Sequence, residues 1–464
     1  MFSPTGLLTL LVIAAVAWRL GTARKSSTLA PLPPGPPADP IIGHVRIIPS
    51  SRPELSFQKW AKEYGYDVIY LNLMGQPAVI LNSAEAAVDL MDKRGAIYSD
   101  RPDFHLFEES GWRDVLTFAN GGTPSVANRK ILRKALSNRS FRSLICGGHF
   151  LRNSQAHLIL SVAHGIKITD NNDPFLVLAE KIAWYFAHGG SPGSTLVDIL
   201  PFIRRLPWWV RIFPSLNFAR DNYPIIRQFQ EAPFAAAKCP IGSGVSEISF
   251  VRNMLEDMQL GTSEESGITE DDIKGAAGTM YAAGADTTLS TLVVWVLCMV
   301  LNPEVQKKLA KKSIASLGGT TYQIEGNCPS QIGWCTRQLV VQLGFPHKSN
   351  KDDVYKNMFI PKGSLVIANA HAITHDPSVY AEPDQFNPDP YIPTSEGEAG
   401  EPLPVGYFGF GRRVCPGQYL GTASVWISIA SMLATFRISK ELDKNGNEII
   451  PTPGMTTGLE SYGS

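Results

Sequence analysis

The sequence is poor in cysteine and has no excess of either charge. Its 464 residues include six cysteines, and no two of them form a Cys-x-x-Cys pair. A zinc framework would need such spacings, and a disulfide scaffold would need a higher cysteine density. Basic and acidic residues number 42 each, which gives no electrostatic footprint for nucleic acid. We therefore expect a reduced, cytosol-facing protein with no nucleic-acid partner.

Two more absences concern cofactors and domain borders. No Gly-x-Gly-x-x-Gly follows a strand-like run, so the chain has no dinucleotide fingerprint of its own. The length corresponds to about three average domains, but no internal linker divides the chain. With 44% hydrophobic residues, we expect one large domain over residues 46–464.

The N-terminus lacks an apolar run of full membrane-spanning length. Residues 6–18 are nearly all apolar, which is short of the roughly 20 residues that cross a bilayer comfortably. A cleaved signal peptide is the alternative, since residues 15–17 resemble a cleavage site. The basic residues follow the apolar run instead of preceding it, which favours an anchor with the rest of the chain on the cytoplasmic side. We expect an anchor and basic flank over residues 1–25 and a stiff proline-rich linker over residues 26–45.

A single cysteine lies in a glycine-rich loop directly before a long apolar run, residues 418–436. A helix dipole and neighbouring arginines favour the thiolate form of Cys415, which is a metal ligand. Gly411 and Gly417 allow the backbone to approach a flat ligand, and Arg413 could pair with an anionic group on it. The alternative is a buried, inert cysteine in a turn.

A second unusual stretch lies inside a predicted helix over residues 269–301. A glycine, an acid and two threonines interrupt its otherwise apolar sequence. These residues lower stability, since Gly costs a helix up to about 1 kcal/mol against Ala and a buried carboxylate costs more. Small residues at Ala283 and Gly284 would leave room for a ligand, and Asp286 and Thr287 could relay protons. Alternatively, the threonine hydroxyls bond to the preceding turn.

These stretches resemble the cytochrome P-450 family of haem-thiolate monooxygenases. The loop matches all five fixed positions of the family's haem-binding motif, Phe-x-x-Gly-x-Arg-x-Cys-x-Gly: Phe408, Gly411, Arg413, Cys415 and Gly417. The helix matches the family's oxygen-activation motif. The resemblance implies a mainly α fold with small β-sheets, haem b as cofactor, Cys415 as the iron ligand, and proton delivery by Asp286 and Thr287.

The resemblance also implies two contacts to the haem propionates. In the family, a helix at the place of residues 125–141 carries a tryptophan and, four residues on, an arginine that bind them. Arg129 matches the arginine, but Ser125 stands at the tryptophan position. His347 follows a segment that resembles another propionate-binding stretch.

The resemblance further implies a reaction and partners. The enzyme would insert one oxygen atom from O2 into a small apolar organic substrate, with electrons from a membrane-bound NADPH-cytochrome reductase. It would sit on the endoplasmic reticulum membrane with its catalytic domain facing the cytosol. Residues 200–216 would be core or a membrane-facing surface. The text of residues 285–303 is similar to fungal members of secondary metabolism. An isomerase or peroxygenase that uses the same iron is the alternative within haem-thiolate chemistry.

Two fixed features of the family are missing. The sequence contains no Glu-x-x-Arg, whose expected place lies within residues 312–342, and Pro390 replaces the third member of the same salt-bridge triad. Residues 312–342 have poor helical periodicity. We interpret them as an altered reading of the gene or a decayed copy, with residues 146–150 as a second such scar. A non-catalytic haem protein is therefore the alternative function.

Short apolar runs predict a few strands. Residues 67–73 and 78–81 are strand-like and are separated by turn residues. Residues 83–93 predict a helix with Ser83 as its cap. Residues 353–360 and 364–370, joined by Pro-Lys-Gly, predict a hairpin.

Overall fold

The computed structural model describes residues 30–113, 115–118, 129–133, 135–136, 154–168, 170, 172–190, 195–238, 249–261, 268–317, 341–387 and 401–451. Several predicted features lie outside the described residues. They are the N-terminal anchor, Ser125, residues 146–150, residues 318–340 of the atypical segment, and Pro390.

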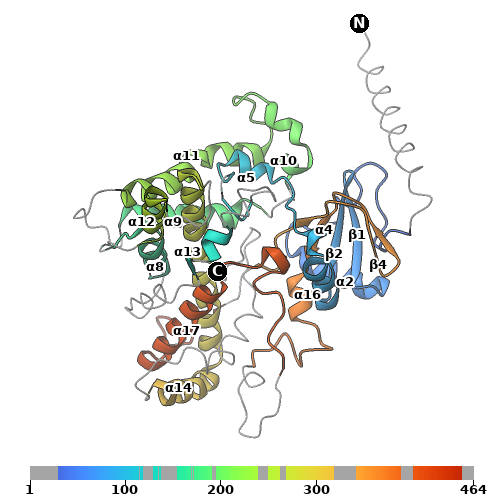
Figure 1. The fold of residues 1–464 in the computed structure, drawn as a ribbon. Coiled ribbons are helices and arrows are strands. Elements are labelled where there is room, and N and C mark those ends of the chain that lie inside the picture. The colour runs from blue at the N-terminus through green and yellow to red at the C-terminus, as the bar shows by residue number, and fades with distance from the viewer. Residues whose placement is uncertain are drawn as a thin grey trace.

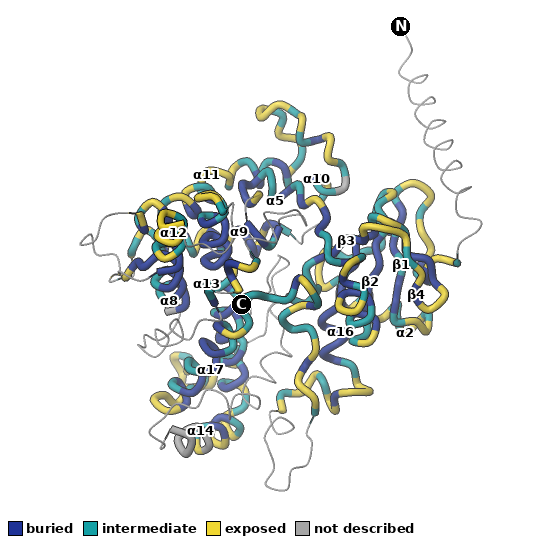
Figure 2. Tube along the Cα trace, viewed as in Figure 1, coloured by how far each residue is buried: buried dark blue, intermediate teal, exposed yellow. Residues whose placement is uncertain are grey.

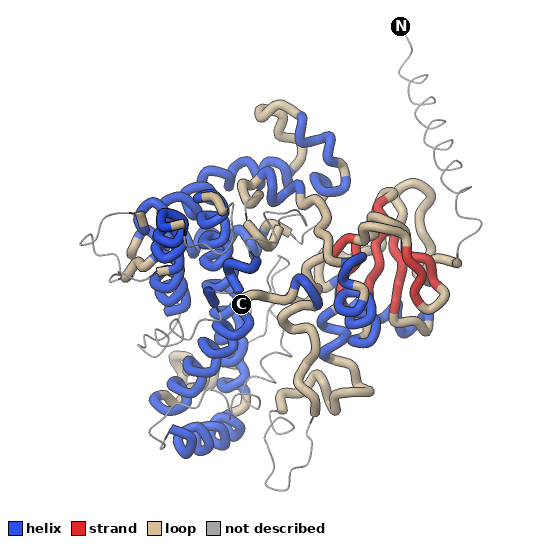
Figure 3. Tube along the Cα trace, viewed as in Figure 1, coloured by secondary structure: helices blue, strands red, loops and turns tan. Residues whose placement is uncertain are grey.

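A four-stranded sheet forms one half of the molecule (Figures 1 and 3). Its order is β1 (Val68–Leu73), β2 (Gln76–Leu81), β6 (Leu365–Ala368) and β3 (His347–Lys348). The β1–β2 and β6–β3 pairs are antiparallel, and β2 and β6 are parallel. The two strands predicted near residues 67–81 are confirmed.

Both faces of this sheet are covered, because alternate side chains of a strand point to opposite faces. On one face, Ile69 and Ile80 pack with Phe57 of helix α2 (Pro53–Tyr64). On the other face, Val68 and Val79 pack in a separate cluster with residues of the next helical segment. The sheet is therefore a buried layer, as its dark colour in Figure 2 shows.

The predicted hairpin of residues 353–360 with residues 364–370 is wrong in its pairing. The tight hairpin lies within the first segment, where β4 (Asp353–Tyr355) pairs with β5 (Met358–Ile360). Lys356 and Asn357 both have positive φ, as a two-residue hairpin turn requires. Leu365–Ala368 instead enters the larger sheet between β2 and β3.

The proline-rich stretch is attached to both sheets where the structure describes it. The amide of Tyr70 donates to the carbonyl of Pro34 at 2.9 Å, and the amide of Phe359 donates to Pro31 at 2.7 Å. Gly35 allows this approach, since a Cβ there would lie 2.3 Å from the Tyr70 carbonyl oxygen.

Helices form the other half around α13 (Glu270–Leu301) (Figure 1). The predicted helix is confirmed, with Thr269 and Asp272 forming a capping box at its start. Its neighbours are α8 (Ser154–His164), α9 (Pro174–His188), α11 (Pro214–Ala237), α12 (Phe250–Leu260), α14 (Pro303–Leu317) and α17 (Gln418–Thr435). Among the described residues, α13 is the one helix long and apolar enough to cross a bilayer. Its packing against these neighbours makes it a core helix.

Shorter elements connect the two halves. They are α3 (Ala84–Ala87), η2 (Val88–Lys93), α4 (Gly95–Tyr98), α5 (His105–Glu109), α10 (Leu196–Ile199), η3 (Pro201–Arg205), α16 (Ala370–Thr374) and η5 (Gly411–Arg413). The predicted helix over residues 83–93 is thus α3 continued by η2, which is wound as a π-helix, and Ser83 caps it by accepting from Ala86. The expected class, mainly helical with small sheets, is confirmed.

Candidate active site

The cysteine loop is folded back on itself and locked against the N-terminal half of the chain. The amide of Cys415 donates to the carbonyl of Phe408 at 2.8 Å, which closes the loop. Gly411 has a φ of +55° and lies so close to η2 that a Cβ would be 2.1 Å from the Met91 carbonyl oxygen. Helix α17 begins directly after Gly417. The sequence prediction of a cysteine loop opening a helix is confirmed.

The environment of the Cys415 sulfur favours the thiol when no metal is bound. The residue keeps some exposed surface, yet burial of the sulfur among protein atoms raises its pKa. The Gly417 amide and Arg129 lower that pKa by a smaller amount. Arg412 and Arg413, from which we expected help, do not provide it, because the first side chain is exposed and the second points to the carbonyl of Ser99. A thiolate here therefore needs a cation, and a coordinated metal deprotonates a thiol outright.

Three arginines gather beside this loop from distant parts of the chain; Arg101 and Arg413 are buried and Arg129 is half-buried. Arg413 donates from Nε to the carbonyl of Ser99 at 2.8 Å, and Arg129 donates to the carbonyl of Val414 at 2.7 Å. The third, Arg101, donates from Nη1 to main-chain carbonyls of the segment before β3, at 2.7 and 3.0 Å. All three guanidiniums thus hold neutral carbonyls.

Burial and mutual repulsion lower the pKa of these arginines. Burial lowers the pKa of Arg129 to about 10, with Arg413 and Arg133 adding repulsion. The pKa of Arg101 is lowered furthest, by burial and by the charges of Arg413 and Arg129. Asp100 offsets part of the charge on Arg413. Arg101 Nε is also buried without a hydrogen-bond partner in the described part of the chain. Such a cluster is suited to an anionic ligand, which would pair with the guanidiniums.

His347 lies in the same cluster as a neutral side chain. It is buried, and its Nδ1 lies 2.7 Å from the Tyr98 carbonyl, to which it donates. Burial, together with the charges of Arg101 and Arg413, lowers its pKa well below the usual value. A neutral ring that donates from Nδ1 carries a lone pair on Nε2. It could therefore hold a carboxylate through Nε2 only after taking up a proton.

The middle of α13 has one open face and one closed face. Ala283 is exposed and Thr287, one turn later, is half-buried, although the helix runs through the core. The Thr287 hydroxyl donates to the Ala283 carbonyl at 2.7 Å, as in the structural alternative named above, and its oxygen can still accept a bond. Asp286 is buried.

Gly284 lies against a neighbouring helix. A Cβ at this position would lie 2.9 Å from Cδ1 of Ile159 on α8. The expectation that Ala283 and Gly284 leave room for a ligand stays a prediction; Ala283 is exposed, whereas Gly284 faces the Ile159 side chain. A larger residue in place of Gly284 would force that side chain to shift.

A loop after α5 borders the open face of α13. The Leu116 amide donates to Thr279 Oγ1 at 3.0 Å, one helical turn before Ala283. The Phe118 ring lies 6.2 Å from the ring of Phe345, which stands next to the segment held by Arg101. Arg101 and these apolar residues were missed in the sequence, where nothing in their spacing connects them.

Comparisons with known proteins agree with this site. A family model described as Cytochrome P450 matches residues 33–148, 150–325 and 337–460. The chain belongs to the cytochrome P450 family. Cytochrome P450 monooxygenase 98 of Postia placenta is 35% identical over 462 residues, which cover 92% of this chain and 87% of that protein. A cytochrome P450 monooxygenase of Armillaria gallica is 33% identical, with 97% and 93% covered. Cytochrome P450 monooxygenase ple1 of Rhodocybe pseudopiperita is 34% identical, with 91% and 86% covered.

This membership gives the class of reaction. The chain is an enzyme of the haem-thiolate monooxygenase class, which uses O2, a redox partner and an organic substrate. The described residues fit the haem group: a cysteine at the start of a helix for the iron, and a largely buried arginine cluster for carboxylates. The alternative of a decayed, non-catalytic protein gains no support from these comparisons.

Proposed function

We propose that this enzyme inserts one oxygen atom from O2 into a small apolar molecule of secondary metabolism, with electrons from an NADPH-cytochrome reductase. The observation that carries the proposal is the position of Cys415, at the start of α17 and beside a cluster of three arginines. The loop after α5 forms an apolar wall beside the open face of α13, because it contributes Leu116 and Phe118. Apolar walls of this kind suit a hydrophobic substrate.

Haem b is the cofactor form that this site suits best. Its iron would bind the Cys415 sulfur, and its two propionates would pair with Arg413, Arg129 and Arg101. Phe408, Gly411 and Gly417 would shape the loop around the ring. The absence of any Cys-x-x-Cys spacing argues against covalent attachment of the haem. When bound, the haem supplies oxygen activation, with a thiolate ligand favouring O–O cleavage.

His347 would support one propionate in its protonated form. An incoming carboxylate neutralises the nearby guanidiniums, so the pKa of His347 would rise when the haem binds. Haem binding would then take up a proton at Nε2, while Nδ1 keeps its bond to the Tyr98 carbonyl.

Asp286 and Thr287 would deliver protons from α13. The Thr287 hydroxyl is anchored to the Ala283 carbonyl, which orients its free lone pairs toward the open face of the helix. Asp286 is adjacent in sequence and buried. These two groups would pass a proton from solvent to a bound ligand.

A membrane location is supported by an exposed apolar surface. Phe202 of η3 and, in the segment between η3 and α11, Trp208, Trp209 and Ile212 have exposed fractions of 64%, 77%, 66% and 70%. Tryptophan is typical of the interface between membrane and water. With residues 1–25 as anchor, residues 26–45 as linker and residues 46–464 as haem domain, the enzyme would lie on the cytosolic side of the endoplasmic reticulum.

Our interpretation of residues 312–342 as an altered reading of the gene or a decayed copy is also a proposal. The matched ranges of the family model leave out residue 149 and residues 326–336. Both lie in segments that we interpret as altered readings of the gene. Sequencing the transcript across them is the test, and an unaltered frame would contradict this interpretation.

The function is tested by expressing the chain as written, reducing it and adding carbon monoxide. A strongly red-shifted haem band is expected, because Cys415 would bind the iron as a thiolate. A band typical of a neutral ligand would contradict the proposed site. Product formation with NADPH and a membrane-bound reductase would then separate monooxygenation from isomerase or peroxygenase chemistry.

A further inference from the structure

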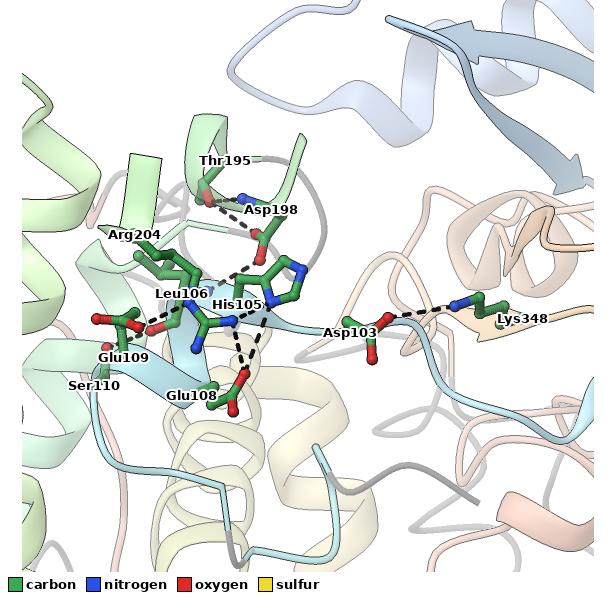
Figure 4. Close-up of polar contacts among 10 residues, drawn as sticks. All are labelled: Asp103, His105, Leu106, Glu108, Glu109, Ser110, Thr195, Asp198, Arg204 and Lys348. Carbon is green, nitrogen blue, oxygen red and sulfur yellow. Dashed lines mark hydrogen bonds and ion pairs between the residues drawn. The ribbon is translucent and has the colours of Figure 1, made fainter. Parts of the chain in front are cut away.

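Helix α5 is held at its start by a half-buried carboxylate. Asp198 of α10 accepts from the Leu106 amide at 3.1 Å and from the Thr195 hydroxyl at 2.8 Å (Figure 4). Burial raises the pKa of Asp198, and these hydrogen bonds lower it again by a smaller amount. The short helix thus docks its N-terminal end on α10.

The polar side chains of α5 meet at one guanidinium. Arg204 of η3 donates from Nε to Glu109 at 2.7 Å, and its Nη1 lies 3.0 Å from Glu108 Oε2 (Figure 4). Nη1 also lies 2.7 Å from His105 Nδ1. Because Nη1 is a donor, this ring nitrogen accepts. About a quarter of each side chain of the Arg204–Glu109 pair is exposed, which limits screening by water.

The segment that carries Arg204 is itself fixed to a long helix. Arg220 of α11 donates to the main-chain carbonyls of Arg204 at 3.2 Å and Leu206 at 2.8 Å. Gln230, further along α11, donates to the carbonyl of Gly111 at 3.0 Å. Arg204 therefore connects α5 to a rigid base.

The chain that follows α5 forms the apolar wall described above, in which Leu116 bonds to Thr279 and Phe118 contacts Phe345. A five-residue helix has no stability of its own, so its position depends on its contacts. Without Arg204, Glu108 and Glu109 would be left as neighbouring negative charges. The wall would then lose the support at its N-terminal end.

We propose that Arg204 is a positioning residue that sets the size of the molecules admitted beside the open face of α13, by fixing α5 and the wall of residues 112, 113 and 115–118. This role rests on the proposed haem site, because the wall borders the open face of α13. Arg204 acts through α5 and is not itself a catalytic residue. Loops that close over a site commonly control access in this way.

The first test measures amide hydrogen exchange of residues 105–118 in the holoenzyme. In Arg204→Met, exchange is expected to be about tenfold faster, since a local opening becomes easier. The matched control is Arg211→Met, which removes an ion pair to Asp221 in the same connecting region without touching α5. Glu109→Gln provides a second variant with the same expected direction. Unchanged exchange in both Arg204→Met and Glu109→Gln overturns the proposal.

The second test uses azoles of different size as iron-binding probes. The compared quantity is the rate of phenylimidazole binding divided by the rate of imidazole binding. This ratio should be about fivefold higher in Arg204→Met than in the wild type, because the wall moves aside for the larger ring. Exchanging the charges, with Arg204→Glu and Glu109→Arg together, should restore the wild-type ratio. Equal ratios in Arg204→Met and Arg211→Met overturn the proposal. A wild-type protein without the red-shifted carbon monoxide band contradicts the haem site instead, and the exchange experiment still decides the role of Arg204.

Discussion

The guanidinium of Arg129 donates a 2.7 Å hydrogen bond to the main-chain carbonyl of Val414, the residue before Cys415. The same guanidinium lowers the pKa of the Cys415 thiol. One side chain therefore fixes the loop and adds positive potential near the sulfur. It also belongs to the arginine cluster, so the proposed iron ligand and the proposed carboxylate site share a residue.

Cys415→Ser is expected to abolish the red-shifted carbon monoxide band, because a serine hydroxyl does not replace a thiolate on iron. The measurement is the absorption spectrum of the reduced, carbon monoxide-treated protein. Cys298→Ala is the matched control, since Cys298 is buried in α13 and its pKa is raised to about 12 by burial. A retained band in Cys415→Ser would assign the iron to another ligand.

Arg413→Met is expected to weaken haem binding about tenfold or more, since a charge-assisted hydrogen bond contributes roughly 1.5–3 kcal/mol. The stability of the apoprotein should fall little, because the variant also removes repulsion from Arg101 and Arg129. Haem transfer to a competing haem-binding protein gives the affinity. Arg94→Met, which breaks an ion pair with Asp353, is the control. Equal haem loss in both variants would contradict the role of Arg413.

Thr287→Ala is expected to lower the product formed per NADPH consumed, with more reduced oxygen released as peroxide. The carbon monoxide band should stay, because the substitution leaves Cys415 untouched. Thr291→Ala is the control, since its hydroxyl makes the same kind of bond one turn later, to the Thr287 carbonyl. An equal amount of product per NADPH in Thr287→Ala and Thr291→Ala would mean that the Thr287 hydroxyl only bonds to the helix backbone.

Gly284→Ala is expected to destabilise the protein by about 1–3 kcal/mol, the usual cost of overpacking. The new Cβ would lie 2.9 Å from Cδ1 of Ile159. Adding Ile159→Val removes that atom and should recover part of the loss in a double-mutant cycle. Gly278→Ala on the same helix is the control, because its Cβ would meet a flexible Gln230 side chain at 3.4 Å. Denaturant unfolding gives the free energy of unfolding of the wild type and of each variant. Fully additive effects of Gly284→Ala and Ile159→Val would rule out the contact.

Stability is expected to fall as the pH drops from about 6.5 toward 3. Burial lowers the pKa of His164 from 6.5 to about 3, so between these values the unfolded chain binds more protons than the folded one. The contribution of neutral His164 to the free energy of unfolding is therefore fully present above pH 6.5. His164→Leu should flatten this slope, and His188→Gln, at an exposed position, should not. Urea unfolding at pH 7.5 and 5 decides between them.

The contiguous parts of the site could be predicted from the sequence. The cysteine loop and the middle of α13 each bring their candidate residues together within a few positions, so residue types, spacing and the family resemblance could single them out. Arg101 could not be found in this way, because it reaches the site through the carbonyl of Phe345, 244 residues away. The role of Gly284 likewise depends on Ile159, which belongs to another helix.

Strand pairing and the protonation state of Cys415 could not be predicted from the sequence, because both depend on contacts between distant parts of the chain. Apolar text predicted a strand near residues 365–368, but its parallel partner β2 lies far away in the sequence. The dipole argument for a thiolate at Cys415 considered neighbours along the chain, whereas burial by tertiary packing decides the direction of the pKa shift. Local patterns thus predicted which residues matter, and packing determined what they contact.

The contact between Gly411 and the Met91 carbonyl has a consequence for biosynthesis. A ribosome adds about 5–20 residues per second, so roughly 15–60 s separate the synthesis of these two positions. During that interval η2 has no cysteine loop to pack against, and Arg101 has no Arg413 beside it. The cofactor pocket is therefore completed late, and haem capture should follow the emergence of residue 415 instead of guiding the folding of the first segments.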